Sequence, residues 1–323
     1  MPVLVYAENW DGQFKKATFE AVSYASQIAE KSGDSVTAVS IGEVSEETLK
    51  SIGKYGADKI LVAGNEKLKQ YRVSSYAAAI VQAAEKEGAK LVIFASTFNG
   101  KSLAPRVAAR MKAAAITGVI DIPQMDGDFI VKKPVFSGKG FSHVKMESDK
   151  KVLALLVNSV KAQENPKEAS IEKFNVEIDD AAVNTEIKEV KKSTGKLSLT
   201  EAEVVVSGGR GMKSPDNWGP LEELAETLGA ATACSKPVSD MDWRPHSEHV
   251  GQTGLAIRPN LYIAIGISGA IQHLAGVNAS KVIAVINKDP EAPFFKAADY
   301  GIVGDAFEVL PKLIKAAKEL KAS

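Results

Sequence analysis

The sequence predicts an α/β protein of two domains, each built on a parallel sheet. Short β-branched runs alternate with helical patterns in both halves of the 323 residues, and 45% of the residues are hydrophobic. Repeated alternation of strand and helix is typical of parallel sheets covered on both faces. A polar, charged stretch at residues 163–196 separates the two halves. We therefore expect domains at residues 1–194 and 195–323, with the boundary near Gly195.

The first domain is expected to begin as a regular series of strands and helices. The predicted strands are residues 3–6, 36–40, 60–62 and 91–95, and the predicted helices are residues 17–31, 46–53, 74–87 and 102–112. Turn signals such as Asp126-Gly127 and Ser137-Gly138 then separate four strands, at residues 117–122, 129–134, 140–147 and 152–157. These four are expected to be antiparallel additions at one edge of the domain. Apolar residues alternate with polar ones at Phe174, Val176 and Ile178, which predicts a strand in part of the polar stretch.

The second domain repeats the alternation. The predicted strands are residues 204–206, 261–265, 282–286 and 300–303, and the predicted helices are residues 217–228, a helix from Ala270, and residues 307–321. Four or five parallel strands with glycine-rich turns predict a doubly wound, Rossmann-like sheet with a ligand crevice above the strand ends. A loop of about thirty residues around Arg244 shows no clear secondary structure, and loops of that length usually have a binding role.

Composition excludes several classes of protein. Forty basic residues balance forty acidic ones, which argues against a protein that binds nucleic acid or anionic lipid surfaces. The single cysteine, Cys234, excludes internal disulfides and cysteine metal clusters, and it fits a reducing compartment. No segment reaches the roughly 18 consecutive apolar residues that span a bilayer, and no basic region precedes the first strand. These features predict a soluble, cytoplasmic protein.

The most informative segment is residues 261–273, LYIAIGISGAIQH. An apolar strand turns through glycines into the start of a helix, where unpaired backbone N–H groups and the helix dipole favour an anion. Ser268 and Gly269 would form a phosphate cradle, with Gln272 and His273 in the first helical turn. The alternative for His273 is a helix residue packed against the sheet.

Three other turns offer ligand contacts. Residues 207–211, SGGRG, combine glycines with the charged fork of Arg210, although a tight turn with a solvated arginine is an equal alternative. In residues 250–254, VGQTG, the Thr253 hydroxyl can donate to a ring nitrogen. Asn287 and Asp305 suit the hydroxyls and adenine of a dinucleotide, and helix capping is the alternative for Asp305 and for Asp289.

No catalytic set assembles from these residues. Ser207 lacks a nucleophile-elbow pattern, and no Walker lysine follows a GxxxxG. His246 and His249 lack a third metal ligand, so we expect surface histidines and no metal site. A ligand site of this kind predicts that a bound cofactor supplies the chemistry, while the protein positions the cofactor and tunes its electrostatics.

Four ordered motifs give the second domain a family resemblance. SGGRG at 207–211, VGQTG at 250–254, LYIAIGISGAIQHLAG at 261–276 and INKDPEAPFFKAADYGIVGD at 286–305 resemble the α subunit of electron transfer flavoprotein. The first domain resembles it more loosely, through FAST at 94–97 and GKSLAPR at 100–106. The resemblance implies an electron carrier, not an enzyme, in which FAD lies mainly in the C-terminal domain and the N-terminal domain contacts a β subunit.

The resemblance also implies partners and contacts. The flavin would accept electrons from acyl-CoA dehydrogenases of fatty acid β-oxidation and pass them to a membrane quinone oxidoreductase. The alternative is a subunit of an NADH-oxidising, electron-bifurcating complex, and the β subunit would hold AMP or a second FAD. The location would be the cytoplasm, or the mitochondrial matrix for a processed eukaryotic form. The implied FAD contacts are Arg210, Ser235, Lys236, Val250, Gly251, Gln252, Thr253, Ser268, Gly269, Ala270, Ile271, Gln272, His273, Asn287, Asp305 and Ala306.

Three of these residues have implied roles. Thr253 would donate toward flavin N5, and His273 would lie beside the pyrimidine O2, where positive groups favour negative charge on the flavin. Many family members have arginine where this chain has Lys236. Lysine keeps the charge but loses the planar stacking fork. An ATP-binding universal-stress protein is a weaker alternative, because the first domain shows no glycine-rich phosphate loop.

Overall fold

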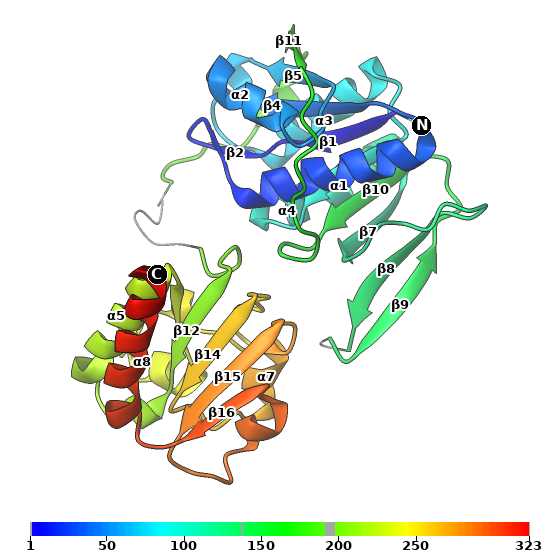
Figure 1. Cartoon of the computed structure of the whole chain (residues 1–323). Helices are drawn as coiled ribbons and strands as arrows, with labels where there is room; N and C mark the ends of the chain where they lie inside the picture. The colour runs from blue at the N-terminus through cyan, green and yellow to red at the C-terminus, as the bar shows by residue number, and fades with distance from the viewer. Residues whose placement is uncertain (1, 137, 191–197, 323) are drawn as a thin grey trace. The chain divides into compact units, whose positions relative to one another are not determined.

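The computed structural model describes residues 2–136, 138–190 and 198–322, and the chain folds as two compact units (Figure 1). The first unit contains the elements from β1 to β11, and the second contains those from β12 to α8. The predicted boundary near Gly195 lies outside the described residues. Within the described residues, no helix combines the length and apolar character needed to cross a membrane.

The described part of the first unit contains a seven-stranded sheet in the order β11-β5-β4-β1-β6-β10-β7, with every pairing parallel. Its strands are β1 Val3–Tyr6, β4 Val36–Ile41, β5 Lys59–Ala63, β6 Leu91–Ala95, β7 Ala114–Val119, β10 Lys151–Leu155 and β11 Ser170–Phe174. Its helices are α1 Lys16–Ser32, α2 Glu46–Gly53, α3 Val73–Lys86 and α4 Phe98–Met111. Shorter elements are the strands β2 Asn9–Trp10 and β3 Gln13–Phe14, and the 3-10 helices Glu66–Leu68 and Asp180–Val183.

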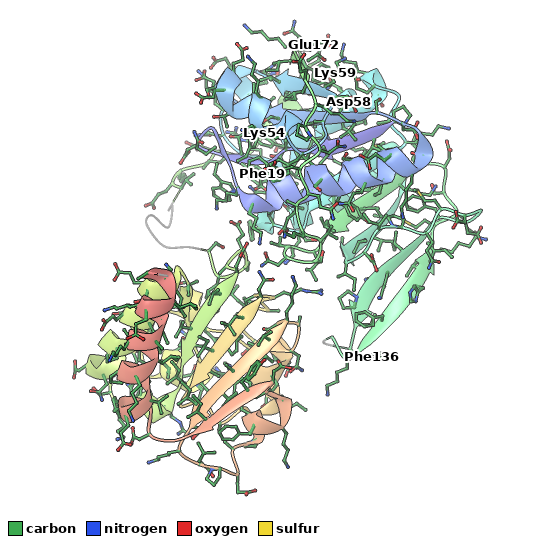
Figure 2. The ribbon with its side chains drawn as sticks, in the orientation of Figure 1. Phe19, Lys54, Asp58, Lys59, Phe136 and Glu172 are labelled. Atoms are coloured by element: carbon green, nitrogen blue, oxygen red, sulfur yellow. The ribbon has the colours of Figure 1, made fainter. Side chains whose placement is uncertain are left out.

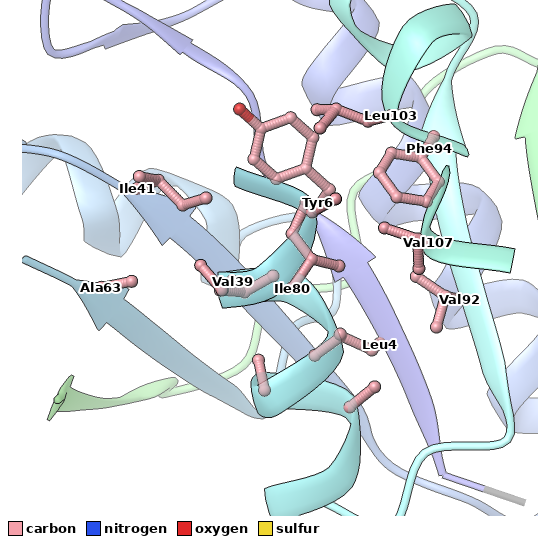
Figure 3. Packing of buried hydrophobic residues seen from close by; sticks show 14 of the residues in the cluster. Leu4, Tyr6, Val39, Ile41, Ala63, Ile80, Val92, Phe94, Leu103 and Val107 are labelled. Atoms are coloured by element: carbon pink, nitrogen blue, oxygen red, sulfur yellow. The ribbon is translucent and has the colours of Figure 1, made fainter. Parts of the chain in front are cut away.

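The two faces of this sheet bury separate cores because successive strand residues point to opposite faces. In β1, Leu4 and Tyr6 join residues of α3 and α4, while Val3 and Val5 pack with residues of α1 and α2. Figure 3 shows the first of these cores, where the Tyr6 and Phe94 rings lie 5.8 Å apart. The predicted strand and helix series of residues 1–112 is therefore confirmed, with its bounds shifted by a few residues.

Two of the four strands expected to be antiparallel are parallel instead. β10 lies between β6 and β7 and pairs with both in the parallel direction. All five of its residues are buried, as in an interior strand covered on both faces. The remaining two strands, β8 Ile130–Val135 and β9 Gly140–Lys145, form a separate two-stranded sheet. Phe136, 84% exposed, follows β8 directly (Figure 2).

The edge strand β11 carries ion pairs that oppose strand addition by another chain. Glu172 of β11 accepts from Lys59 of β5 at 2.8 Å and from Lys86 at 2.9 Å. Nearby, Lys167 reaches Asp58 at 2.9 Å. Figure 2 labels Asp58, Lys59 and Glu172 in this region. This edge is therefore charged and paired.

The described part of the second unit contains a five-stranded parallel sheet in the order β13-β12-β14-β15-β16. Its strands are β12 Val204–Gly208, β13 Ala231–Cys234, β14 Leu261–Ile265, β15 Val282–Asn287 and β16 Tyr300–Val303. Its helices are α5 Gly219–Leu228, α6 Lys236–Asp240, α7 Ile271–Val277 and α8 Ala306–Ala322, with 3-10 helices at Arg210–Met212, Pro215–Trp218, His246–Glu248 and Pro293–Ala297. The predicted doubly wound sheet is confirmed.

The long loop expected around Arg244 is shorter than predicted, because β13 and α6 occupy its first part. β13 is only four residues long, ATAC, and pairs with β12 from Ala231 onward. Beyond α6, the chain returns along the outer side of β13. There the backbone of His249 forms an isolated parallel β-bridge with Cys234. The free edge at β13 is therefore partly covered by the chain itself.

Candidate functional site

The strand order of the second unit defines where its ligand crevice lies. β12 comes first in the chain, β13 lies on one side of it and β14 on the other. The connections therefore run in opposite directions from β12, and the carboxyl ends of β12 and β14 form the switch point at which open α/β sheets bind ligands. SGGRG spans the end of β12 and the turn after it, and GISGA follows β14.

Glycines allow the two turns to pack directly on each other. A Cβ on Gly209 would lie 2.2 Å from the carbonyl oxygen of Gly266, and one on Gly211 would lie 2.6 Å from the Gly266 Cα. Backbone bonds join the turns, from Gly209 N to Ile265 O at 2.9 Å and from Gly211 N to Gly266 O at 3.0 Å. These glycines therefore allow the backbones of the two turns to lie in direct contact. Arg210 between them is exposed.

The turn after β14 presents free backbone donors. Among the described residues, no acceptor contacts the N–H groups of Ser268, Gly269 and Ala270. Ser268 and Ala270 are exposed, while Gly269, at φ +83°, leaves no room for a Cβ, which would lie 2.4 Å from the Cβ of Phe294. Consecutive unpaired N–H groups at the surface suit an anionic oxygen. α7 follows with Ile271 and Gln272, both exposed.

The VGQTG turn docks onto α7. Gln252 N donates to the carbonyl of Gln272 at 2.7 Å, and Gly251 N donates to Leu255 O at 3.1 Å. A Cβ on Gly276 of α7 would lie 2.5 Å from Gly251 N, so only glycine permits this approach. Val250 and Gly251 are buried, whereas the side chains of Gln252 and Thr253 are exposed. The structure therefore brings the second and third predicted motifs together.

His273 is buried beneath this turn. Its Nε2 lies 2.8 Å from the hydroxyl of Tyr262 in β14, and only 7% of its surface is exposed. Burial lowers the pKa of His273 to about 4, so the imidazole is neutral at physiological pH. The packed-helix alternative describes this geometry, and His273 supplies no positive charge. Sequence reasoning missed Tyr262 because it reads as one apolar strand residue among five.

Ser235 and Lys236 follow β13. Ser235 is buried, and its N–H donates to the carbonyl of Gly208 at 3.1 Å, which ties it to the end of β12. The Lys236 side chain is 56% exposed and pairs with Asp240 one turn along α6, at 2.9 Å. Burial lowers the pKa of His249, and the positive charge of Lys236 lowers it further. Both residues therefore lie at the β13 side of the switch point.

Asn287, Asp305 and Ala306 have structural partners. Asn287 Nδ2 donates to Ile267 O at 3.0 Å and so supports the turn after β14. Asp305 accepts from the N–H of Phe307 at 2.9 Å, as expected of the helix-capping alternative, and this bond lowers its pKa. Lys213 approaches the same carboxylate at 3.7 Å, while Ala306 is buried at the start of α8.

The two loop histidines have separate environments. His246 is exposed, and its Nδ1 lies 2.7 Å from the hydroxyl of Ser239. The expectation of a surface histidine is wrong for His249, which is buried against the backbone of Gly254. No group of three potential metal-ligating side chains lies together in the described parts of the chain. Cys234 is buried, which raises the pKa of its thiol to about 12. Its thiol is therefore protonated at neutral pH.

Comparisons with known proteins identify relatives along the whole chain. Residues 3–179 match the family described as "Electron transfer flavoprotein domain", and residues 198–278 match the "Electron transfer flavoprotein FAD-binding domain". The chain is 43% identical to "Electron transfer flavoprotein subunit alpha" of Bacillus subtilis over 323 residues, which cover 98% of each chain. It is 37% identical to the protein of the same name from Thermoanaerobacterium thermosaccharolyticum, covering 99% of this chain and 98% of that one. It is 36% identical to "Protein FixB" of Clostridium saccharobutylicum, covering 98% and 96%.

Proposed function

The chain belongs to the electron transfer flavoprotein family, as an α subunit with a role in electron transfer, and on that premise we propose that its second unit binds FAD at the switch point between β12 and β14. The observation that carries the proposal is the row of unpaired N–H groups from Ser268 to Ala270. This row lies within the residues that match the FAD-binding family domain, 198–278. The pyrophosphate of FAD would accept hydrogen bonds from it.

The remaining predicted contacts lie around this row. Ser235 and Lys236 come from the end of β13, Arg210 from the turn after β12, and Val250–Thr253 from the turn docked on α7. Further contacts come from Ile271, Gln272, Asn287, Asp305 and Ala306. Their arrangement supports a ligand that extends across several strand ends, as a dinucleotide does.

FAD would supply the redox chemistry when bound, and this chain would orient it and tune its charge. We assign to Thr253, whose side chain is exposed, the hydrogen bond toward flavin N5. Arg210 and Lys236 would supply positive charge, since His273 is neutral. His273 keeps its proposed place near the pyrimidine ring, as a buried neutral residue whose Nε2 is bonded to Tyr262.

The first unit, which corresponds to the proposed domain 1–194, would contact a β subunit, and residues 195–323 would form the FAD-binding domain. We propose that the heterodimer carries electrons in the cytoplasm from acyl-CoA dehydrogenases to electron transfer flavoprotein:quinone oxidoreductase. In this role the protein is a carrier with no reaction of its own.

The test is co-expression with the β subunit. The purified heterodimer should be yellow and should release FAD on denaturation, one equivalent of it attributable to this chain. Substitution of Ser268 by proline removes one of the unpaired donors and should reduce FAD retention. A correctly assembled but colourless complex that takes up no added FAD would contradict the proposal.

A second candidate is a subunit of an NADH-oxidising, bifurcating complex. The match to "Protein FixB" keeps this candidate open, because that relative is about as similar to this chain as two proteins named "Electron transfer flavoprotein subunit alpha". Stopped-flow mixing of the heterodimer with NADH distinguishes the two. Rapid flavin reduction supports the bifurcating complex, and its absence supports the simple carrier.

A further inference from the structure

Tyr262 and His273 form a buried polar pair at the candidate site. Tyr262 is in β14 and fully buried, and His273 is in the first turn of α7. The Tyr262 hydroxyl and His273 Nε2 are 2.8 Å apart, and Phe294 packs against both rings, with centroid distances of 6.3 and 5.7 Å. Because both residues are buried and Phe294 packs against them, their polar contact is shielded from water.

The second imidazole nitrogen faces the VGQTG turn. Nδ1 of His273 is buried without a hydrogen-bond partner of good geometry among the described residues. Two polar groups act on the pKa of His273 besides burial, since His249 lowers it and the backbone of Val250 raises it. Because the Val250 N–H already donates to the carbonyl of Cys234 at 3.1 Å, the group left to face Nδ1 is the Val250 carbonyl. A carbonyl accepts, so it favours a proton on Nδ1.

We propose that Tyr262 is a positioning residue that donates its phenolic proton to Nε2 of His273 and so holds the imidazole in the neutral tautomer with its proton on Nδ1, beneath Val250–Thr253. In the opposite tautomer, Nε2–H would donate to the phenol oxygen, and an unprotonated Nδ1 would face the Val250 carbonyl. Two acceptors would then face each other in a buried place, which is unfavourable.

This pair supports the turn that carries Thr253. α7 already holds the turn through the bond from Gln252 N to Gln272 O, one residue before His273. In the proposed tautomer, the Nδ1–H donor would face the buried side of Val250 and so favour this position of the turn. The consequence for FAD rests on the proposed function, because the turn matters to the flavin only if the flavin lies there. The tautomer of His273 does not depend on it.

The test of the tautomer is ¹⁵N NMR of the full chain in its heterodimer, with labelled histidine. The chain has only four histidines, so His143, His246 and His249 can be assigned by substitution. We expect His273 to carry its proton on Nδ1 and to remain neutral at pH 6. In Tyr262→Phe, its signals should move toward the Nε2–H tautomer that free imidazoles prefer. The matched control is Tyr300→Phe, which alters an exposed tyrosine of the same sheet and should change nothing.

A wild-type spectrum with the proton on Nε2, or one that Tyr262→Phe leaves unchanged, would overturn the inference. The wild-type spectrum decides the tautomer even if the variant fails to fold. FAD titration gives the second readout, with about ten-fold weaker binding expected for Tyr262→Phe, the usual effect of one buried hydrogen bond, and none for Tyr300→Phe. If the wild-type heterodimer binds no FAD but shows the Nδ1–H tautomer, the proposed function fails and the positioning of His273 stands.

Discussion

Arg244 and Glu248 form a two-pronged ion pair in the second unit. Arg244 Nε donates to Glu248 Oε2 at 2.8 Å, and Nη2 donates to Oε1 at 3.0 Å. Their side chains are only 14% and 7% exposed. Arg244 also reaches Glu222 of α5 at 2.7 Å and lies 5.7 Å from the centre of the Trp218 ring. Arg244 therefore links the segment that leads into VGQTG to α5 through Glu222.

Glu248→Gln should destabilise the second unit by about 3 kcal/mol, because it leaves the buried Arg244 charge only partly compensated. Urea unfolding of the full chain, followed by tryptophan fluorescence, measures the change, since Trp218 lies beside Arg244. Glu319→Gln is the control, as it removes one partner of an exposed pair whose atoms are 4.0 Å apart. It should cost less than about 1 kcal/mol. Equal losses in the two variants would contradict a stabilising role for the buried pair.

Gly209→Ala should disrupt the switch point. Its Cβ would meet the backbone oxygen of Gly266 at 2.2 Å, so the turns after β12 and β14 would have to separate. We expect a loss of about 2 kcal/mol in unfolding free energy and weaker FAD binding. Gly219→Ala is the matched control, because no atom lies within 4 Å of the added Cβ at the start of α5. It should be neutral or slightly stabilising. Similar behaviour of both variants would show that the turns are not tightly packed.

His273 should make the stability of the second unit depend on pH. Its pKa is lowered from 6.5 to about 4 by burial. As the pH falls below 6.5, the unfolded chain takes up a proton that the folded chain does not, so stability decreases until about pH 4. The loss between pH 7 and pH 5 should be about 2 kcal/mol. Denaturation of His273→Gln at both pH values should show a correspondingly smaller decrease, whereas His143→Gln, at an exposed position, should match the wild type.

Sequence patterns predicted the elements whose signal is local. The helices and interior strands of both units repeat at helical or strand spacing, so their existence follows from periodicity. β13 could not be predicted in this way, because Ala-Thr-Ala-Cys becomes a strand only through its pairing with β12. The direction of β7 and β10 also depends on long connections. α4 links β6 to β7, and residues 120–150 return the chain to the start of β10, so that both strands run parallel to β6.

The candidate site could be predicted in outline because glycine turns after parallel strands meet at one edge of a sheet. The partners within it could not. Tyr262 and His273 are eleven positions apart, and only the packing of α7 on β14 determines that their polar atoms meet. The second and third motifs likewise meet because glycine at 276 admits the backbone of Gly251, a tertiary contact without a local signal.

Lys236→Met tests whether this lysine tunes the proposed flavin. Lys236 is exposed and pairs with Asp240 at 2.9 Å, so part of its field is already neutralised. A positive charge near the flavin favours the added negative charge of reduction, so its removal should lower the potential of the first step. One exposed charge contributes about 1 kcal/mol, or about 40 mV for one electron. Lys236→Arg should retain the wild-type potential, and Lys315→Met should leave it unchanged, because Lys315 follows Ala306 on α8 by about 14 Å along the helix. Potentiometric titration of the heterodimer compares all four proteins, and an unaltered potential in Lys236→Met would remove Lys236 from the set of residues that tune the flavin.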